Sequence, residues 1–188
     1  LAPRPFFVYL INLGNVYLFR AMYEMGKGHD PEPSFDEAIR NYEAAAALNP
    51  SVSQCFSNLG SVYLKRGEWQ MGRGEDPMPS FLKGRENLQK AVELNPNRPA
   101  GHYNLHTSCL AVAVQEMQAG RSPEAWLGQA RGALDRALAL RPGFYEYLRA
   151  QGEVDLYLAR WRVRAGGDPE AHFRAAAAAF EASLKANP

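Results

Sequence analysis

The tripeptide Leu48-Asn49-Pro50 returns as Leu94-Asn95-Pro96, as Leu140-Arg141-Pro142 and as Ala186-Asn187-Pro188. Successive copies are 46 residues apart, as the step from Leu48 to Leu94 shows. Self-similarity at a fixed period of this length is typical of a solenoid, in which stacked units contact their neighbours and none has a core of its own. We therefore divide the chain into four repeats, residues 5–50, 51–96, 97–142 and 143–188.

A second motif lies in the middle of every repeat. It reads Gly28-His29-Asp30-Pro31 in the first repeat, and it recurs at residues 74–77, 120–123 and 166–169. Glycine suits the left-handed residue that ends one helix, and an Asp or Ser side chain can accept the free N–H groups of the next helix. Proline fits as the first helical residue, because its missing N–H costs nothing there. Each repeat is thus expected to be a helical hairpin, capped at Asp30, Asp76, Ser122 and Asp168.

Hydrophobic spacing within the hairpins predicts helices rather than strands. In the first repeat Phe35, Ala38, Ile39, Tyr42 and Ala45 are three or four residues apart, which places them along one side of a helix. No segment alternates with the period of two that a half-buried strand requires. We expect an all-α fold with helices of about 17 to 20 residues, each hairpin ending at an Asn-Pro or Arg-Pro stop.

Composition favours a single soluble domain over residues 1–188. The chain is 46% apolar, and 21 Lys and Arg oppose 20 Asp and Glu, for a net charge of +1. Because no repeat carries the basic excess that a phosphate-binding surface needs, we expect no nucleic-acid partner. Cys55 and Cys109 lie at non-equivalent places in different repeats, so they are interpreted as buried small residues in a reducing, cytoplasmic compartment.

The N-terminal stretch Phe6 to Phe19 is dense in apolar residues but is not a membrane span. It contains Asn12, Gly14 and Asn15, and it falls short of the roughly 18 to 20 apolar residues that cross a bilayer. Residues 6–11 are apolar on every side of the expected helix, whereas helices that end a solenoid normally turn a polar face outward. We expect a preceding repeat or a second copy to cover it, the latter as self-association. The chain begins at Leu1 rather than Met, and we expect it to be a fragment of a longer chain or a processed product.

The repeats resemble the tetratricopeptide repeat (TPR) family over essentially the whole chain. The first-helix signature of that family appears as Leu10, Leu13, Gly14 and Tyr17, and again as Phe56, Leu59, Gly60 and Tyr63. The second-helix signature appears as Ala38, Tyr42, Ala45 and Pro50. HEAT and armadillo units are also near this length, but they do not explain these residues at this spacing. The resemblance implies a right-handed superhelical solenoid of four hairpins and eight helices.

Two departures from the family pattern stand out. The unit is 46 residues long where the family has 34, so we expect both helices to be one or two turns longer. The third and fourth repeats also drift: His106 replaces the small glycine in the third, and Cys109 in the third and Asp155 in the fourth replace the tyrosine of the first helix. The elongated unit with its Gly-x-Asp-Pro joint is similar to repeat regions attached to bacterial serine/threonine kinases.

The resemblance implies a noncatalytic scaffold that binds a peptide or helix through a concave groove lined by the first helices. The residues that it places there are Ile11, Asn12, Asn15, Asn58, Ser61, Lys65, Tyr103, Asn104, Thr107 and Arg149. A branch of the family grips C-terminal carboxylates with asparagines plus lysine or arginine. At the matching places, which include Ile11, Asn58 and Ala100, the asparagines are kept and the cations are missing. We therefore predict weak or no binding of chaperone tails. An equally good interpretation is that Asn12, Asn58 and Asn104 bind backbone groups within the repeat stack.

The alternative function is a regulatory or sensor region of a larger bacterial signalling protein, such as a serine/threonine kinase, that binds a small ligand or peptide. The chain itself has no glycine-rich loop after a strand, no His-Arg-Asp and no Asp-Phe-Gly, so phosphoryl transfer is not assigned to it. No cluster of titratable residues indicates an enzyme.

His102, His106 and Cys109 are four and three residues apart on one expected helix and could begin a zinc site. They align with Phe56, Gly60 and Tyr63 of the packing face, and a fourth ligand is missing. The prediction is therefore no metal and no cofactor, with the two histidines in the core.

Overall fold

The computed structural model describes residues 6–187, and every regular element in that range is a helix. The helices are α1 Phe6–Gly26, α2 Glu32–Leu48, α3 Ser53–Gly72, α4 Met78–Leu94, α5 Pro99–Gln118, α6 Glu124–Leu140, α7 Tyr145–Arg164 and α8 Glu170–Ala186. The all-α expectation and the expected helix lengths are confirmed, α1 being slightly longer at 21 residues. No helix among residues 6–187 has both the length and the apolar composition that a membrane crossing requires.

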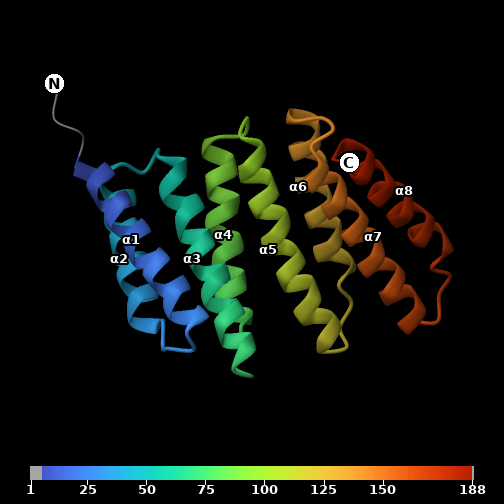
Figure 1. Ribbon diagram of the computed structural model, residues 1–188, viewed down its shortest axis with the longest axis horizontal. Coiled ribbons are helices and arrows are strands. Elements are labelled where there is room, and N and C mark those ends of the chain that lie inside the picture. The colour runs from blue at the N-terminus through green and yellow to red at the C-terminus, as the bar shows by residue number, and fades with distance from the viewer. Residues whose placement is uncertain (1–5, 188) are drawn as a thin grey trace. The chain divides into compact units, whose positions relative to one another are not determined.

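The chain divides into two compact units at the boundary between the second and third repeats. Unit 1 is Leu1–Asn95 and holds α1 to α4, and unit 2 is Pro96–Pro188 and holds α5 to α8. In unit 1, α1 packs on α2, α3 packs on α4, and α2 also contacts α3 (Figure 1). Unit 2 repeats this arrangement, with the hairpins α5–α6 and α7–α8 joined through α6 and α7. Within each unit, two hairpins therefore pack together as neighbours.

The turn inside each hairpin is built in the same way in all four repeats. Its glycine, such as Gly28, has a φ between 71° and 76°, which is the left-handed region expected at a helix end. The side chain two residues later caps the next helix: the Glu32 N–H donates to Asp30 Oδ1 at 3.1 Å, and Asp76, Ser122 and Asp168 accept in the same way. The predicted caps are thus present.

The proline of this turn lies one residue earlier than expected. Pro31 and its three counterparts occupy the residue before the helix, with helical backbone angles, and the helix begins at the next residue. The Pro31 carbonyl already accepts the N–H of Phe35 at 2.9 Å. The prediction was therefore wrong by one residue, although its reason holds, because the N–H that proline lacks has no helical partner at this place.

Glycine in the first helix allows the two helices of a hairpin to touch. A Cβ added to Gly14 would lie 2.6 Å from the ring of Tyr42, and one added to Gly60 would lie 2.4 Å from Leu88 Cγ. The third repeat lacks this glycine: there His106 is buried with its Nδ1 3.1 Å from the Ala130 carbonyl oxygen. One packing plan thus holds in all four hairpins, with one polar exception.

Candidate functional site

The first helices of each unit lie in contact, α1 with α3 in unit 1 and α5 with α7 in unit 2. We call the surface that each pair shares the first-helix face. All ten residues predicted to bind peptide lie on these four helices. The structure shows how far each of them is available to a ligand.

In unit 1, internal contacts engage most of the predicted residues. Ile11 is buried in the core. Asn15 Oδ1 accepts the Tyr42 hydroxyl at 2.7 Å and the Asn58 side-chain amide at 3.0 Å. Asn58 in turn accepts the side-chain amide of Gln54. Asn15 and Asn58 therefore link α1, α2 and α3 within the stack. Asn58 bonds to the side chains of Asn15 and Gln54, whereas the alternative interpretation had it bind backbone groups.

The remaining predicted residues of unit 1 differ in exposure. The Ser61 hydroxyl donates to the Ser57 carbonyl at 3.0 Å within its own helix, and Lys65 Nζ lies 2.6 Å from Glu68 Oε2. Asn12 is exposed. Burial raises the pKa of Tyr42, at the centre of the amide network, to about 12, so this hydroxyl stays protonated at neutral pH. Of the predicted residues in unit 1, a ligand on the first-helix face could therefore reach Asn12, which is exposed, and Lys65, whose charge is already balanced by Glu68.

In unit 2, the predicted residues combine an aromatic stack with an ion pair. The ring of Tyr103 stacks on Tyr147 with centroids 5.0 Å apart, and burial raises the Tyr103 pKa while the nearby Arg149 lowers it in part. Arg149 itself forms a salt bridge with Glu153 one turn along α7. The Thr107 hydroxyl donates to the Tyr103 carbonyl at 3.1 Å, and Asn104 is half-buried.

Sequence reasoning missed a cationic pocket farther along the same face of unit 2. It has a volume of about 340 Å³ and is lined by α5 and α7 through Val114, Met117, Gln118, Tyr157, Arg160 and Arg164. The Arg160 guanidinium lies 5.8 Å from the centre of the Tyr157 ring. Arg164 Nη1 donates to the Met117 carbonyl at 2.6 Å, which ties α7 to α5 at this end. We call this the arginine pocket.

The arginine pocket keeps its positive charge. Among residues 6–187, neither Arg160 nor Arg164 forms an ion pair with a carboxylate. Glu116 on α5 is already paired with Arg121, whose Nε lies 2.5 Å from Glu116 Oε2. At the equivalent places of α3, unit 1 has the neutral residue Gly72 and Glu68 with its lysine partner. The sequence signal was the run of arginines in the last turns of α7, and it lies in the part of the helix that shorter members of the family lack.

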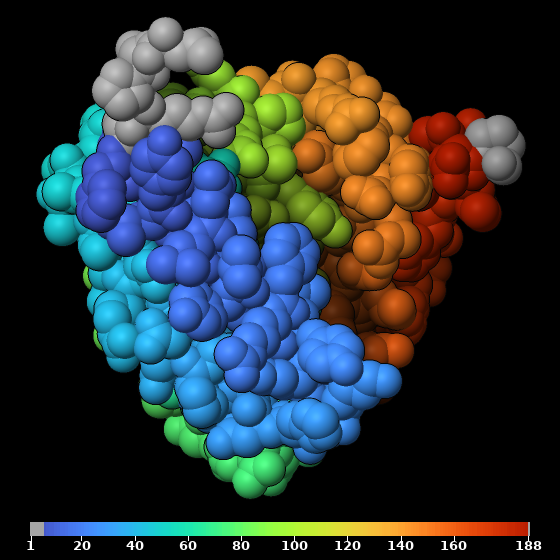
Figure 2. All heavy atoms as spheres, turned by 60° about the vertical axis from the view of Figure 1, so that its left-hand side comes forward, coloured from blue at the N-terminus to red at the C-terminus, as the bar shows by residue number. Residues whose placement is uncertain are grey.

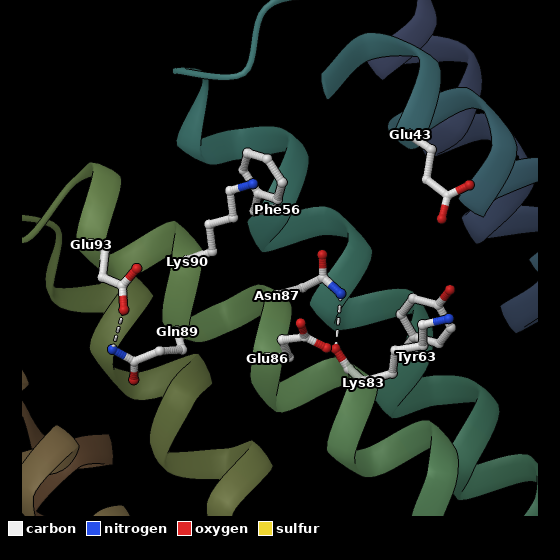
Figure 3. A pocket seen from close by; sticks show the side chains of 9 residues that line it. All are labelled: Glu43, Phe56, Tyr63, Lys83, Glu86, Asn87, Gln89, Lys90 and Glu93. Carbon is white, nitrogen blue, oxygen red and sulfur yellow. Dashed lines mark hydrogen bonds between the residues drawn. The ribbon is translucent and has the colours of Figure 1, made fainter. Parts of the chain in front are cut away.

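A second pocket lies in unit 1 between the second helices. Figure 3 shows the side chains from α2, α3 and α4 that surround its volume of about 480 Å³. Lys90 Nζ lies 4.1 Å from the centre of the Phe56 ring, and Lys83 Nζ lies 5.6 Å from that of Tyr63. Three glutamates share the lining: Glu43, Glu86 and Glu93. The lysines cover aromatic surface beside a surplus of acids, which is the chemistry of a solvated face.

The equivalent groove of unit 2 has a different lining. Here four alanines, Ala175, Ala178, Ala179 and Ala182, line a volume of about 360 Å³. Asp155 stands where unit 1 has Tyr63; it is buried, and it binds Arg131 as well as His172, whose Nδ1 lies 3.3 Å away. Because the two grooves share no polar side chain at equivalent places, they do not indicate one repeated binding site.

The two histidines considered as metal ligands bind backbone carbonyls. His102 Nε2 lies 2.8 Å from the Pro96 oxygen, and His106 contacts Ala130 as described above. Burial lowers the pKa of His106, which keeps that ring neutral. Within residues 6–187, no group of three His, Cys, Asp or Glu side chains is placed to hold a metal ion. Cys55 and Cys109 are buried and form no disulfide within the described residues.

No family model matches this chain, and no curated protein matches it. Solved structures do match. MamA from Desulfovibrio magneticus RS-1, residues 41 to the end, has a TM-score of 0.57 and 14% identity over 92% of this chain and 75% of that one. The first TPR of Spaghetti (RPAP3), bound to the HSP90 peptide SRMEEVD, has a TM-score of 0.52 and 17% identity over 79% of this chain and 98% of that one. IFIT1 has a TM-score of 0.57 and 20% identity over 93% of this chain and 34% of that one.

At these levels of identity the likeness establishes the fold alone. The chain has a TPR-like helical-repeat fold, as its first-helix and second-helix signatures indicated. The structural neighbours include an interaction module that was solved with a peptide in place. The arginine pocket is a property of this chain and is derived from its own residues.

Proposed function

We propose that this chain is a noncatalytic protein-interaction module that holds a peptide or helix on its first-helix faces. A TPR-like neighbour with a bound HSP90 peptide supports this class of function. The observation that carries the proposal is the arginine pocket, because it combines two guanidinium groups that have no carboxylate partner in residues 6–187 with apolar and aromatic surface on that face. A bound peptide needs both kinds of surface, because the charged groups bind its polar atoms and the apolar surface packs against its side chains.

The charge of the arginine pocket selects an acidic peptide. Guanidinium groups bind carboxylates through two parallel hydrogen bonds, and such bonds are about twice as strong as those between neutral groups. Val114, Met117 and Tyr157 then provide apolar contact for a neighbouring aliphatic side chain. We therefore assign the pocket to an Asp or Glu residue next to an apolar one.

A chaperone-type carboxylate clamp is not part of this proposal. The family's clamp positions lie nearer the start of the first helices, where Asn15 and Asn58 bind Tyr42 and each other. Without cations at those places, we keep the prediction of weak or no binding of chaperone tails in that clamp. Within unit 2, the arginine pocket lies several turns farther along the first helices than the matching clamp positions Ala100 and Asn104, so its ligand would lie across the other end of that unit's first-helix face.

Solution NMR of the whole chain tests the proposal. The probes are the peptide acetyl-Leu-Asp-Glu-Leu-amide, its amide counterpart acetyl-Leu-Asn-Gln-Leu-amide, and inorganic phosphate. We expect the acidic peptide to shift the Met117 methyl signal and the side-chain N–H signals of Arg160 and Arg164. The double variant Arg160→Ser and Arg164→Ser should lose the shift of the Met117 methyl signal, while the matched variant Lys65→Ser in unit 1 should keep all of the shifts.

Three results would overturn the acidic-peptide assignment. The neutral peptide could shift the same signals equally, the double variant could retain the Met117 shift, or phosphate could bind as tightly as the peptide. The last result would identify a site for free anions. Because both arginines are exposed, the double variant should lose only the hydrogen bond from Arg164 to Met117, or about 1 kcal/mol in the free energy of unfolding, so a loss of binding would not reflect unfolding.

The regulatory alternative stays a prediction. A sensor region of a bacterial signalling protein, attached to a kinase or another enzyme, would use the same first-helix faces for a small ligand or peptide. Two buried cysteines that are not in a disulfide accord with the cytoplasmic location that is part of both proposals. A small molecule that co-purifies with the chain and shifts the Met117 signal would favour the sensor over the scaffold.

A further inference from the structure

The outward side of α1 carries a row of exposed apolar side chains. Phe6, Tyr9, Leu13, Val16 and Tyr23 follow one another at helical spacing, and between 44% and 68% of each is accessible. Figure 2 shows this end of unit 1 from outside, with the side chains of α1 in dark blue turned to the viewer. We call these five residues the α1 stripe. Large apolar residues gathered in one row on a soluble protein indicate a contact surface.

Repeat equivalence shows what such a stripe packs against. Tyr9, Leu13 and Val16 occupy the same places in α1 as Cys55, Leu59 and Val62 in α3. In α3 these three residues are no more than 4% accessible, and they lie in the cluster that α2 shares with α3. The face that is open in α1 is therefore the face that a second helix covers in the next repeat.

The last helix presents the complementary surface. Phe173 and Leu184 of α8 are 42% and 68% accessible. The equivalent of Phe173 in α6 is Leu127, which is fully buried. The equivalent of Leu184 is Leu138, which packs on the hydrophobic cluster that α6 shares with α7. Among the described helices α8 packs only on α7, so its outward side lacks the following first helix that covers α2 and α6.

The charges match as well as the apolar surfaces. Where α2 covers α3, Arg66 pairs with Glu32 and with Asp36, the latter at 3.2 Å. Arg20 of α1 occupies the place of Arg66, and Glu170 of α8 occupies the place of Glu32. Among residues 6–187, Arg20 pairs with Glu24 and Glu170 pairs with Arg174, each one turn along its own helix. Packing α8 on the α1 stripe would bring Arg20 and Glu170 to the relation that Arg66 and Glu32 have in unit 1.

We propose that copies of this chain associate head to tail, with the outward side of α8 in one copy packed on the α1 stripe of the next, as α2 packs on α3. The two surfaces are different, so each copy keeps one free face after pairing. Such a head-to-tail contact adds copy after copy into an open chain, unless the rotation between successive copies closes the chain into a ring. The wild-type protein should therefore form oligomers that grow with concentration.

Two blocked variants test the contact directly. Val16→Glu places a charge in the α1 stripe, and Leu184→Glu places one on the outward side of α8. Each alone should weaken self-association at least about tenfold in sedimentation velocity, because the contact would bury an unpaired carboxylate. A mixture of the two should form a one-to-one dimer and nothing larger, because each variant retains the face that the other lacks.

Controls and contrary outcomes separate this arrangement from others. Val163→Glu, a change at an exposed apolar residue away from both faces, should associate like the wild type. Circular dichroism of each variant should show the wild-type helix content, since the altered side chains are exposed. A wild-type chain that stays monomeric at every concentration would overturn the proposal. So would self-association that Val16→Glu abolishes and Leu184→Glu leaves intact, because that pattern indicates a symmetric contact between two α1 stripes.

Discussion

Units 1 and 2 have the same helix order and turns, yet they present different surfaces. On the first-helix face of unit 1, Lys65 pairs with Glu68, whereas Arg160 and Arg164 of unit 2 pair with no carboxylate in residues 6–187. Between the second helices, unit 1 places lysines over aromatic rings and unit 2 has alanines. The two units therefore share the same helix packing but differ in the chemistry of their surfaces. We expect a ligand to bind where the surface of one unit differs from that of the other.

The largest expected effect tests the part that the units share. Gly60→Val places a Cβ 2.4 Å from Leu88 Cγ and 3.0 Å from the Gly84 carbonyl oxygen, so the two helices of the hairpin must move apart. We expect the free energy of unfolding to fall by about 3 kcal/mol in urea titrations. Gly128→Ala is the control, because a Cβ there meets nothing within 4 Å, and it should stabilise the chain by up to about 1 kcal/mol. Equal effects of the two changes would refute the close packing.

The next effect concerns the one hairpin that departs from the shared packing. His106 replaces glycine in unit 2, and burial lowers its pKa. The unfolded histidine takes up a proton near pH 6.5, whereas the folded one resists it, so stability is complete above that pH and is lost as the pH falls below it. The contribution changes by at most about 1.4 kcal/mol per pH unit. Urea titrations from about pH 7 to about pH 5 should show a shallower loss in His106→Gln than in the wild type or in the exposed control His29→Gln.

A smaller effect on stability is expected from the amide network of unit 1, which unit 2 does not repeat. Tyr42→Phe removes the hydroxyl that donates to Asn15 and leaves the ring against Gly14. We expect a loss of about 1 kcal/mol in the free energy of unfolding. In unit 2, Phe180 already occupies this place on Gly152 without a hydroxyl, and Glu153, which is paired with Arg149, stands at the place of Asn15. Phe180→Tyr should therefore not gain the same amount, because no free amide is there to accept its hydroxyl. A neutral Tyr42→Phe change would show that the network adds no stability.

The smallest effect tests whether the second-helix pocket of unit 1 matters at all. Lys83→Ala and Lys90→Ala together give it two of the alanines that line the equivalent groove of unit 2. Since cation–π contacts at exposed sites contribute little, we expect a change below about 1 kcal/mol for the pair. Peptide binding at the arginine pocket should be unchanged in the NMR titration. A large loss of either quantity would give this pocket a role that its chemistry does not indicate.

Local signals in the sequence predicted most of the fold. The glycine, aspartate and proline of each joint act on their own turn, so four turns and eight helices followed from nearest neighbours along the chain. Asn15 and Asn58 were harder to assign, because only the fold shows that Tyr42 from a third helix reaches both of them. Arg160 and Arg164 were missed since the expected groove was carried over from a shorter repeat, and the extra turns of α5 and α7 place new residues on that face.

Site-specific photocrosslinking tests the central claim, that the first-helix face of unit 2 recognises acidic peptide, most directly. A photoreactive p-benzoylphenylalanine would replace Gln118 in the arginine pocket, Gly26 at the equivalent place of unit 1, or Lys83 in the second-helix pocket. After irradiation with acetyl-Leu-Asp-Glu-Leu-amide, we predict by mass spectrometry that the peptide is joined to the chain altered at 118 and hardly to the other two. Equal labelling at all three places, or equal labelling by the neutral peptide, would contradict the account.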